Sequence, residues 1–155
     1  MALLSSSERA VVERAGAEHM LDQVLAWSAI NSGSRNLGGL ERMADLLVDA
    51  FAALPGLLRL ENPALVRAVD AGGRPTETRH GRHLHLTVRP TAPIQLLLTG
   101  HMDTVYGLDH PFQETRWIED GVLGGPGVAD MKGGLAVMLA ALKAVEGSPT
   151  ADRIG

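Results

Sequence analysis

A short apolar run near the middle of the chain constrains the fold more than any other feature. Residues 94–99 read Ile-Gln-Leu-Leu-Leu-Thr, a nearly continuous apolar stretch. A strand with one face in water alternates apolar and polar residues, whereas a strand covered on both faces does not. We therefore expect residues 94–99 to form a buried strand.

Helical patterns lie on both sides of this strand. Residues 7–30 carry apolar side chains at broadly helical spacing, although Gly16 weakens the pattern. Residues 37–54 have a stronger apolar face, which ends at Pro55-Gly56. Residues 134–146, which follow the strand, also have apolar side chains at helical spacing along one face. Three helical segments are therefore expected.

Further strands are expected between the second and third helical segments. Residues 57–60 and 65–69 are short apolar runs, and residues 83–88 alternate between apolar and polar side chains. Residues 151–155 resemble the approach to one more strand. Helices interleaved with strands predict an α/β sandwich, and a chain that stops at such an approach suggests a fragment.

Composition excludes several classes of function. Cysteine is absent, so disulfides, thiol nucleophiles and thiolate metal sites are excluded, and any metal must be held by His, Asp or Glu. The net charge of −4, without a basic run, argues against binding to nucleic acid or to an anionic membrane. The apolar start at residues 1–4 is too short for a signal peptide, and no stretch approaches the roughly 20 apolar residues of a membrane span. We expect a cytoplasmic protein.

The expected buried strand leads directly into Gly100-His101-Met102-Asp103. Open α/β sheets place ligand sites just beyond the carboxyl ends of strands. Because alternate residues of an extended segment point to the same side, His101 and Asp103 would project together. One ring nitrogen could then bind a metal while the other donates to a carboxylate. The plainer alternative is a hydrogen-bonded core histidine beside an aspartate that caps a turn.

A glycine-rich segment at residues 124–134 runs into the third helical segment. A lone carboxylate ahead of a helix is usually an N-cap or a partner of the helix dipole. The surrounding glycines instead favour a backbone held close to a site, with Asp130 aimed into it. Since one carboxylate can bridge two cations about 3.5–4 Å apart, His101 and Asp130 would share one metal and Asp130 would reach a second.

A glycine-rich loop before a helix could also cradle a phosphate. The P-loop pattern is absent, because Lys132 is followed by Gly133. The dinucleotide pattern fails as well, because Asp130 occupies the third glycine position. An acidic side chain in the cradle would repel the ligand, so phosphate binding is the weaker alternative and no cofactor-binding residue is assigned.

Residues 97–105 and 125–134 together resemble a known family, the dinuclear zinc exopeptidases and deacylases. The family includes glutamate carboxypeptidase, aminoacylase, acetylornithine deacetylase and succinyl-diaminopimelate desuccinylase. The turn at residues 30–34, followed by a helix, resembles the start of the family. The resemblance implies an α/β, zinc-exopeptidase-like sandwich of a mostly parallel sheet flanked by helices.

The resemblance also implies a role for each matching residue. His101 would bind one zinc ion, Asp103 would serve catalysis by orienting the imidazole, and Asp130 would bridge two zinc ions. The peptide bond after Asp130 is often cis in the family. The two ions, with Co²⁺ or Mn²⁺ as alternatives, would lower the pKa of a bridging water to about 7 and polarise the scissile carbonyl.

The chain departs from the family after Asp130. The family's later Glu-Glu pair, its further acidic ligand, its last His and its lid or dimerisation domain have no counterpart here. Residues 1–155 are therefore expected to be the N-terminal part of a catalytic domain, inactive alone. The expected parent is an amide hydrolase acting on a small peptide or an N-acyl amino acid, dimeric through the absent domain. A non-catalytic fragment that acts as an interaction module and a phosphate-binding domain stay open as alternatives.

Overall fold

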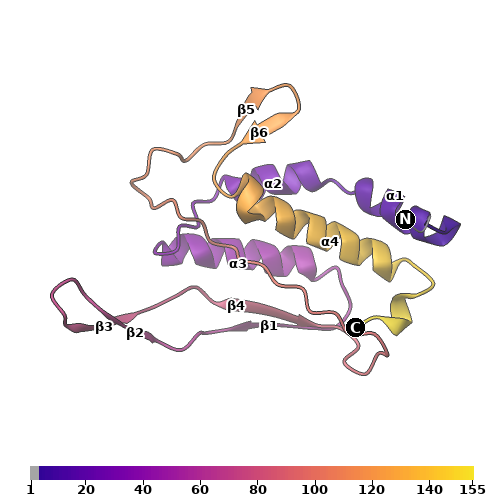
Figure 1. Cartoon of the computed structure of the whole chain (residues 1–155), viewed down its shortest axis with the longest axis horizontal. Helices are drawn as coiled ribbons and strands as arrows, with labels where there is room; N and C mark the ends of the chain where they lie inside the picture. Colours follow the sequence, from indigo (N-terminus) through magenta and orange to yellow (C-terminus); the bar gives the residue numbers. More distant parts are fainter. Residues whose placement is uncertain (1–3) are drawn as a thin grey trace.

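The computed structural model describes residues 4–155, so most of the apolar start at residues 1–4 lies outside the described residues. Helices gather on one side of the β1–β4 pair (Figure 1). The elements in chain order are α1 (Ser6–Gly16), α2 (Met20–Ser28), α3 (Leu37–Phe51), β1 (Leu57–Glu61), β2 (Val66–Val69), β3 (Pro75–Thr78), β4 (His83–Thr87), β5 (Arg116–Glu119), β6 (Val122–Gly124), the π-helical turn η1 (Val128–Lys132), α4 (Gly133–Glu146) and the 3₁₀ turn η2 (Ala151–Arg153).

The apolar pattern over residues 7–30 forms two helices and not one. Helix α1 ends at Gly16, and α2 begins at Met20. A capping box starts α1: the Ser5 hydroxyl accepts from the backbone N–H of Glu8, and the Glu8 carboxylate accepts from the backbone N–H of Ser5. The break follows Gly16, a residue of weak helix propensity.

Helices α3 and α4 form where the sequence predicts them. Helix α3 begins as predicted and ends at Phe51, a little before the predicted end at Leu54. The side chain of Asn36 caps it by accepting from the backbone N–H of Gly39 at 3.1 Å. Helix α4 ends at Glu146, as its apolar periodicity predicts.

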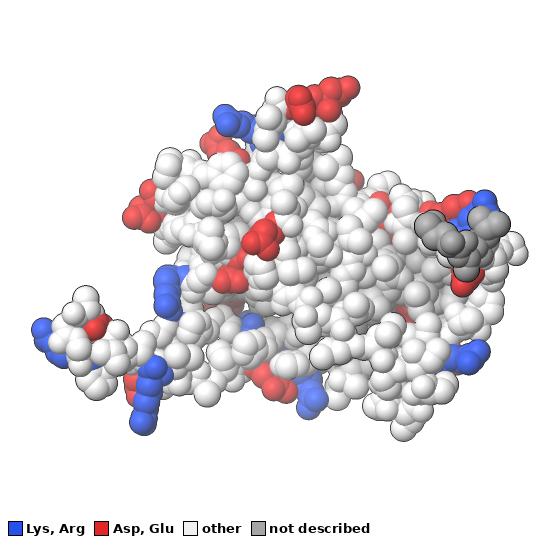
Figure 2. Space-filling model, in the orientation of Figure 1, with Lys and Arg blue, Asp and Glu red and all other residues white. Residues whose placement is uncertain are grey.

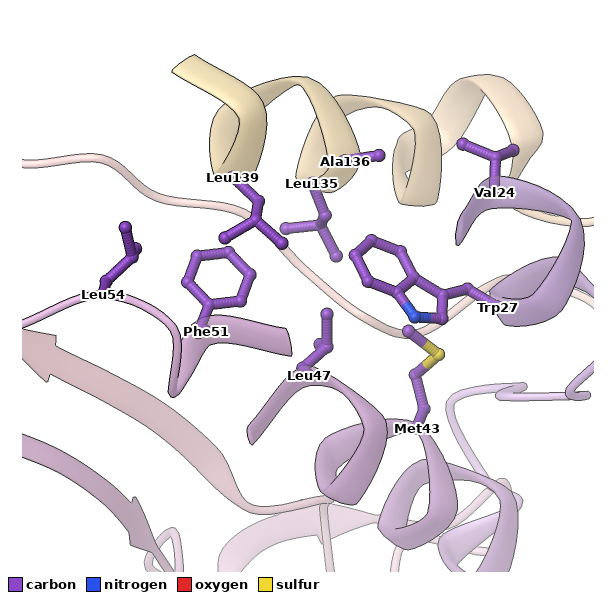
Figure 3. Close-up of a cluster of buried hydrophobic side chains, with 9 residues drawn as sticks. All are labelled: Val24, Trp27, Met43, Leu47, Phe51, Leu54, Leu135, Ala136 and Leu139. Atoms are coloured by element: carbon purple, nitrogen blue, oxygen red, sulfur yellow. The ribbon is translucent and has the colours of Figure 1, made fainter. Parts of the chain in front are cut away.

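The hydrophobic core lies where α2, α3 and α4 meet (Figure 3). Its buried side chains are Val24, Trp27, Met43, Leu47, Phe51, Leu54, Leu135, Ala136 and Leu139. Burial of one side chain of the size of Leu or Phe contributes about 1.5–3 kcal/mol. Packing of Leu135 and Ala136 in this core fixes the first turn of α4, and with it the glycine-rich segment that precedes the helix.

The described strands form three antiparallel pairs: β1 with β4, β2 with β3, and β5 with β6. The predicted mostly parallel sheet is therefore wrong for residues 4–155. Parallel pairing among them is limited to two isolated bridges, Gly33 with Thr104 and Ile94 with Ile154. The α/β class itself holds, since helices and strands alternate along the chain.

Residues 94–99 do not form the predicted buried strand. Three backbone hydrogen bonds around the isolated Ile94–Ile154 bridge join residues 94–96 to residues 153–155. Beyond these bonds, no described residue pairs with the backbone of residues 97–100, and the side chain of Leu97 is 90% exposed. A strand needs a neighbouring ladder for its N–H and C=O groups, so the apolar run alone does not produce one.

Figure 2 shows positive and negative side chains in small separate groups, so neither sign dominates the face drawn. Within residues 4–155, the helices are all too short or too polar to cross a bilayer.

Candidate metal centre

The loop ahead of α3 holds the residues on both sides of Asp103. The hydroxyl of Ser32, a fully buried residue, donates to the carbonyl oxygen of Met102 at 2.7 Å. The backbone of Thr104 donates to Ser32 at 2.9 Å and accepts from Ser34 at 3.0 Å. These bonds fix the backbone around Asp103 relative to α3.

The carboxylate of Asp103 contacts one partner with each oxygen. Oδ2 accepts from the Ser34 hydroxyl at 2.5 Å, and Oδ1 lies 3.1 Å from Nδ1 of His101. The sequence predicted that His101 and Asp103 project together, and the structure brings them into contact. Since Nδ1 faces Asp103, the imidazole presents Nε2 to the opposite side.

The carboxylate of Asp130 contacts the imidazole of His101 on the side opposite Asp103. Its Oδ1 lies 2.9 Å from Nε2 of His101. The Asp130 side chain is 87% exposed and that of His101 45%, so the pair faces solvent. Gly100 lets the chain approach α4 closely, because a Cβ there would lie 2.8 Å from Cδ2 of Leu135. The structure therefore brings His101, Asp103 and Asp130 together.

The glycine-rich segment turns sharply to present Asp130. Gly127 adopts a left-handed conformation with φ of 76°, which favours glycine. Asp130 itself is extended, with φ of −125° and ψ of 96°, and so interrupts the helical turn η1. The peptide bond between Asp130 and Met131 is cis, in agreement with the expectation from the family resemblance.

Lys132 anchors the same segment to α2. Its side chain is fully buried, and Nζ donates to the carbonyl oxygens of Trp27 at 3.0 Å and Ile30 at 2.8 Å. Burial lowers the pKa of Lys132 to about 8. The ammonium group satisfies carbonyl groups at the C-terminal end of α2, where a cation is electrostatically favoured.

The environment of His101 favours its protonated form. Partial burial works against the charge, but it is outweighed by the hydrogen bond that protonated Nε2 donates to the Asp130 carboxylate and by the nearby backbone carbonyl and carboxylate of Asp103, so the pKa of His101 is raised. A cation at Nε2 would be stabilised by the same two carboxylates. The electrostatics of the site therefore suit positive charge between His101 and Asp130.

The three residues fit part of a metal site. One imidazole nitrogen and one carboxylate oxygen 2.9 Å apart are close enough to bind one ion, given Zn–N and Zn–O bonds of about 2.0–2.2 Å. Asp103 contacts Nδ1, the usual arrangement behind a metal-binding histidine. Within residues 4–155, however, no three His, Asp or Glu side chains are grouped so that they could hold an ion. The described residues thus offer two donor groups that could face one ion and a carboxylate behind the imidazole.

A cavity of about 250 Å³ opens beside these residues. Its wall includes His101, Asp103 and Asp130 together with the aromatic residues Tyr106 and Phe112. The two aromatic rings contact each other edge to face, with centroids 4.9 Å apart. An apolar wall therefore lies beside the polar cluster of His101, Asp103 and Asp130.

Sequence reasoning missed Ser34 and the anchoring role of Lys132. The turn at residues 30–34 resembles the start of the family, but nothing local indicates that Ser34 reaches Asp103. Three further histidines lie outside this cluster: His83 and His85 are on the exposed face of β4, and Nδ1 of His110 accepts from the backbone N–H of Phe112.

Both clusters lie within one segment that matches a family of known proteins. Residues 97–153 match the model of peptidase family M20/M25/M40. No curated protein matches the chain. The match to family M20/M25/M40 supports the resemblance drawn from the sequence, and it supports a hydrolase of the peptidase type. Family M20/M25/M40 is generally metal-dependent, which agrees with the paired donors of His101 and Asp130. The match is to the family as a whole and does not separate its members.

Proposed function

We propose that this chain contributes His101, Asp103 and Asp130 to the active site of a two-zinc hydrolase. The enzyme would cleave the amide bond of a small peptide or an N-acyl amino acid. The observation that carries the proposal is the position of the His101 ring between two carboxylates, with Asp130 2.9 Å from Nε2 and Asp103 3.1 Å from Nδ1. The match of residues 97–153 to a peptidase family supports the same chemistry.

Each side chain has a distinct task in this proposal. His101 and Asp130 would hold one zinc ion, and the free oxygen of Asp130 would reach a second. Asp103 would keep the His101 ring in the tautomer that leaves Nε2 free, with Ser34 holding the carboxylate from behind. When bound, the zinc ions would supply an activated water and polarise the scissile carbonyl.

The alternative of phosphate binding has less support. The exposed Asp130 carboxylate belongs to the glycine-rich segment and would repel an anion bound there. Lys132 of the same segment does not face solvent beside Asp130, because its ammonium group donates to the carbonyl oxygens of Trp27 and Ile30 in the interior. A P-loop lysine must reach the phosphates, so this loop lacks the cation that such a site requires.

The inactivity expected of this chain alone follows from its ligand set. His101 and Asp130 are two donors, whereas a catalytic zinc site uses three protein ligands. We therefore propose that the chain binds metal weakly and turns over no substrate without further ligands. The alternative role as an interaction module shares this inactivity but requires no metal binding.

Metal titration separates the two roles. We expect Co²⁺ to bind the chain with a visible absorption spectrum, and Zn²⁺ to displace it. Asp130→Ala and His101→Ala should each abolish the spectrum, because each removes one of two ligands. Asp120→Ala, an exposed carboxylate in the β5–β6 turn, is the matched control and should bind Co²⁺ unchanged.

Two results would end the proposal. One is an absence of Co²⁺ and Zn²⁺ binding at neutral pH in the folded chain. The other is binding that survives Asp130→Ala. Hydrolysis of N-acyl amino acids or dipeptides by the chain alone would support the hydrolase but contradict the proposed inactivity.

A further inference from the structure

The loop at residues 104–113 carries three aromatic rings that contact one another. The centroid of the Tyr106 ring lies 4.9 Å from that of Phe112 and 4.8 Å from that of the His110 imidazole. Edge-to-face and tilted arrangements such as these are favoured for aromatic pairs. Because Tyr106 and Phe112 are only half-buried, this aromatic cluster keeps part of its surface open to other molecules.

Hydrogen bonds from Asn31 and Gln113 hold this loop in place. Nδ2 of Asn31 donates to Oε1 of Gln113 at 2.7 Å. The same nitrogen lies 3.2 Å from the carbonyl oxygens of both Tyr106 and Gly107, to which it also donates. Nε2 of Gln113 donates to the carbonyl oxygens of Gly107 at 2.8 Å and His110 at 2.6 Å. These partners belong to the loop itself and to the turn ahead of α3, so the described residues position the aromatic cluster by themselves.

Two rings of the cluster, those of Tyr106 and Phe112, line the cavity of about 250 Å³ beside His101 and Asp130, and we call them the aromatic wall. Besides the three residues of the candidate metal centre, the side chains that line this cavity are uncharged: Thr104, Val105, Tyr106, Phe112 and Ala129. Among residues 4–155, lysine and arginine do not line it, so a desolvated anionic group would lack a positive partner there. Pockets for drug-sized ligands measure roughly 300–1,000 Å³, so this smaller cavity suits a group of about the size of one aromatic ring.

We propose that the aromatic wall binds an uncharged aryl group of the substrate, next to the amide bond that is cleaved. The inference rests on the proposed hydrolase and names its substrate class: peptides or N-acyl amino acids with an aromatic ring beside the scissile amide. The ring of the substrate packs on Tyr106 and Phe112 as aromatic pairs do. The amide attached to it then lies beside His101 and Asp130, which line the same cavity.

The test uses the whole chain labelled with 3-fluorotyrosine. The sequence contains one tyrosine, so a single ¹⁹F resonance reports on Tyr106. The two probes are N-benzoylglycinamide and N-acetylglycinamide, which are both uncharged and differ in the aryl group. We expect N-benzoylglycinamide to shift the resonance saturably and to bind at least about tenfold more tightly, because only this probe buries a ring. Equal affinities for the two probes, or a resonance that neither probe shifts, would overturn the proposal.

A pair of variants tests the wall itself. Phe112→Ala removes one ring of the wall and keeps the reporter at Tyr106, and we expect it to lower the ratio of the two affinities about three- to tenfold. Trp117→Ala removes an exposed ring of β5 that does not line the cavity, so it is the matched control and should keep the ratio. An unchanged ratio in Phe112→Ala, or an equal loss in both variants, would contradict the role of the wall. The comparison of the two probes on the unaltered chain does not depend on the folding of either variant.

Addition of Co²⁺ separates this inference from the proposed hydrolase. The preference for N-benzoylglycinamide should already exist in the metal-free chain, because it requires only the aromatic wall. Co²⁺ should then tighten the binding of both probes, because the amide carbonyl oxygen can reach the ion. Tighter binding with Co²⁺ but no preference between the probes would overturn the aromatic wall and leave the hydrolase standing. A preference that is present while Co²⁺ has no effect would support the wall and count against the hydrolase.

Discussion

The hydroxyl oxygen of Ser34 lies 2.5 Å from Oδ2 of Asp103, so the loop ahead of α3 holds the carboxylate that contacts His101. The orientation of the imidazole therefore depends on a residue far away in the sequence. Partners of this kind fix both the tautomer and the ring position of a metal-binding histidine.

Loss of either partner should weaken metal binding. We expect Asp103→Asn to lower Co²⁺ affinity about 10- to 100-fold, because the amide no longer favours the required tautomer. Ser34→Ala should lower it about 2- to 10-fold, since it removes one hydrogen bond to the carboxylate. Isothermal titration with Co²⁺ measures both. A larger loss of Co²⁺ affinity in Ser34→Ala than in Asp103→Asn would contradict the view that Asp103 orients His101 directly and that Ser34 acts through Asp103.

Lys132 should contribute more to stability than an exposed lysine. Lys132→Met leaves the buried carbonyl oxygens of Trp27 and Ile30 without their donor, and we expect a net loss of ~1–3 kcal/mol in the free energy of unfolding. Lys143→Met, which removes a partly exposed ion pair with Glu18, is the control and should cost at most about 1 kcal/mol. Urea denaturation measures both, and equal losses would refute the anchoring role.

A side chain at Gly127 should be costly for two separable reasons. Gly127 and Gly121 have nearly the same φ, 76° and 74°, so alanine at either site bears the left-handed conformation, which costs ~1–2 kcal/mol. Only at Gly127 would the new Cβ also crowd Lys132, at 2.9 Å from Cδ, whereas nothing lies within 4 Å at Gly121. Gly127→Ala should therefore destabilise the chain more than Gly121→Ala in thermal unfolding. Equal shifts in Tm would show that the lysine simply moves aside.

The sequence predicted the features that depend on local spacing. The apolar faces of α3 and α4 repeat within each helix, and the alternation over β4 follows its own exposed and half-buried residues. The contact of His101 with Asp103 is equally local, since two-residue spacing places both side chains on one side. Periodicity is a property of a single segment, so it can be recognised in the sequence without knowing which other segments pack against it.

The errors and omissions all involve partners distant in sequence. Residues 94–99 have the composition of a buried strand, yet a strand also needs a paired neighbour. Within residues 4–155 that pairing comes only from residues 153–155 and reaches only residues 94–96. The contact of Asp130 with His101 was expected through metal chemistry and family resemblance, not through any local pattern. Ser34 reaches Asp103, and Lys132 reaches α2, across long stretches of chain that no pattern in the sequence connects.

The pairing of Arg89 with Glu146 should make stability depend on pH. Nη1 of Arg89 donates to Oε1 of Glu146 at 2.8 Å, with both side chains about three-quarters buried. This hydrogen bond from Arg89 lowers the pKa of Glu146 below its ordinary value of 4.5, despite the opposing effect of burial. A carboxyl group whose pKa is lower in the folded chain binds fewer protons there than in the unfolded chain. Its contribution to stability is therefore fully present above pH 4.5 and is lost as the pH falls through the folded pKa.

Glu146→Gln should remove that dependence. At neutral pH the variant loses about 1 kcal/mol, because an amide accepts more weakly from the guanidinium group than a carboxylate does. Below pH 4.5 the difference between the variant and the original chain should shrink, since the protonated carboxyl group also lacks its charge. Urea denaturation from about pH 3 to pH 6 measures this, with the exposed Glu114→Gln as the control. A stability difference between Glu146→Gln and the original chain that stays constant over this range would show that Arg89 does not stabilise the ionised form.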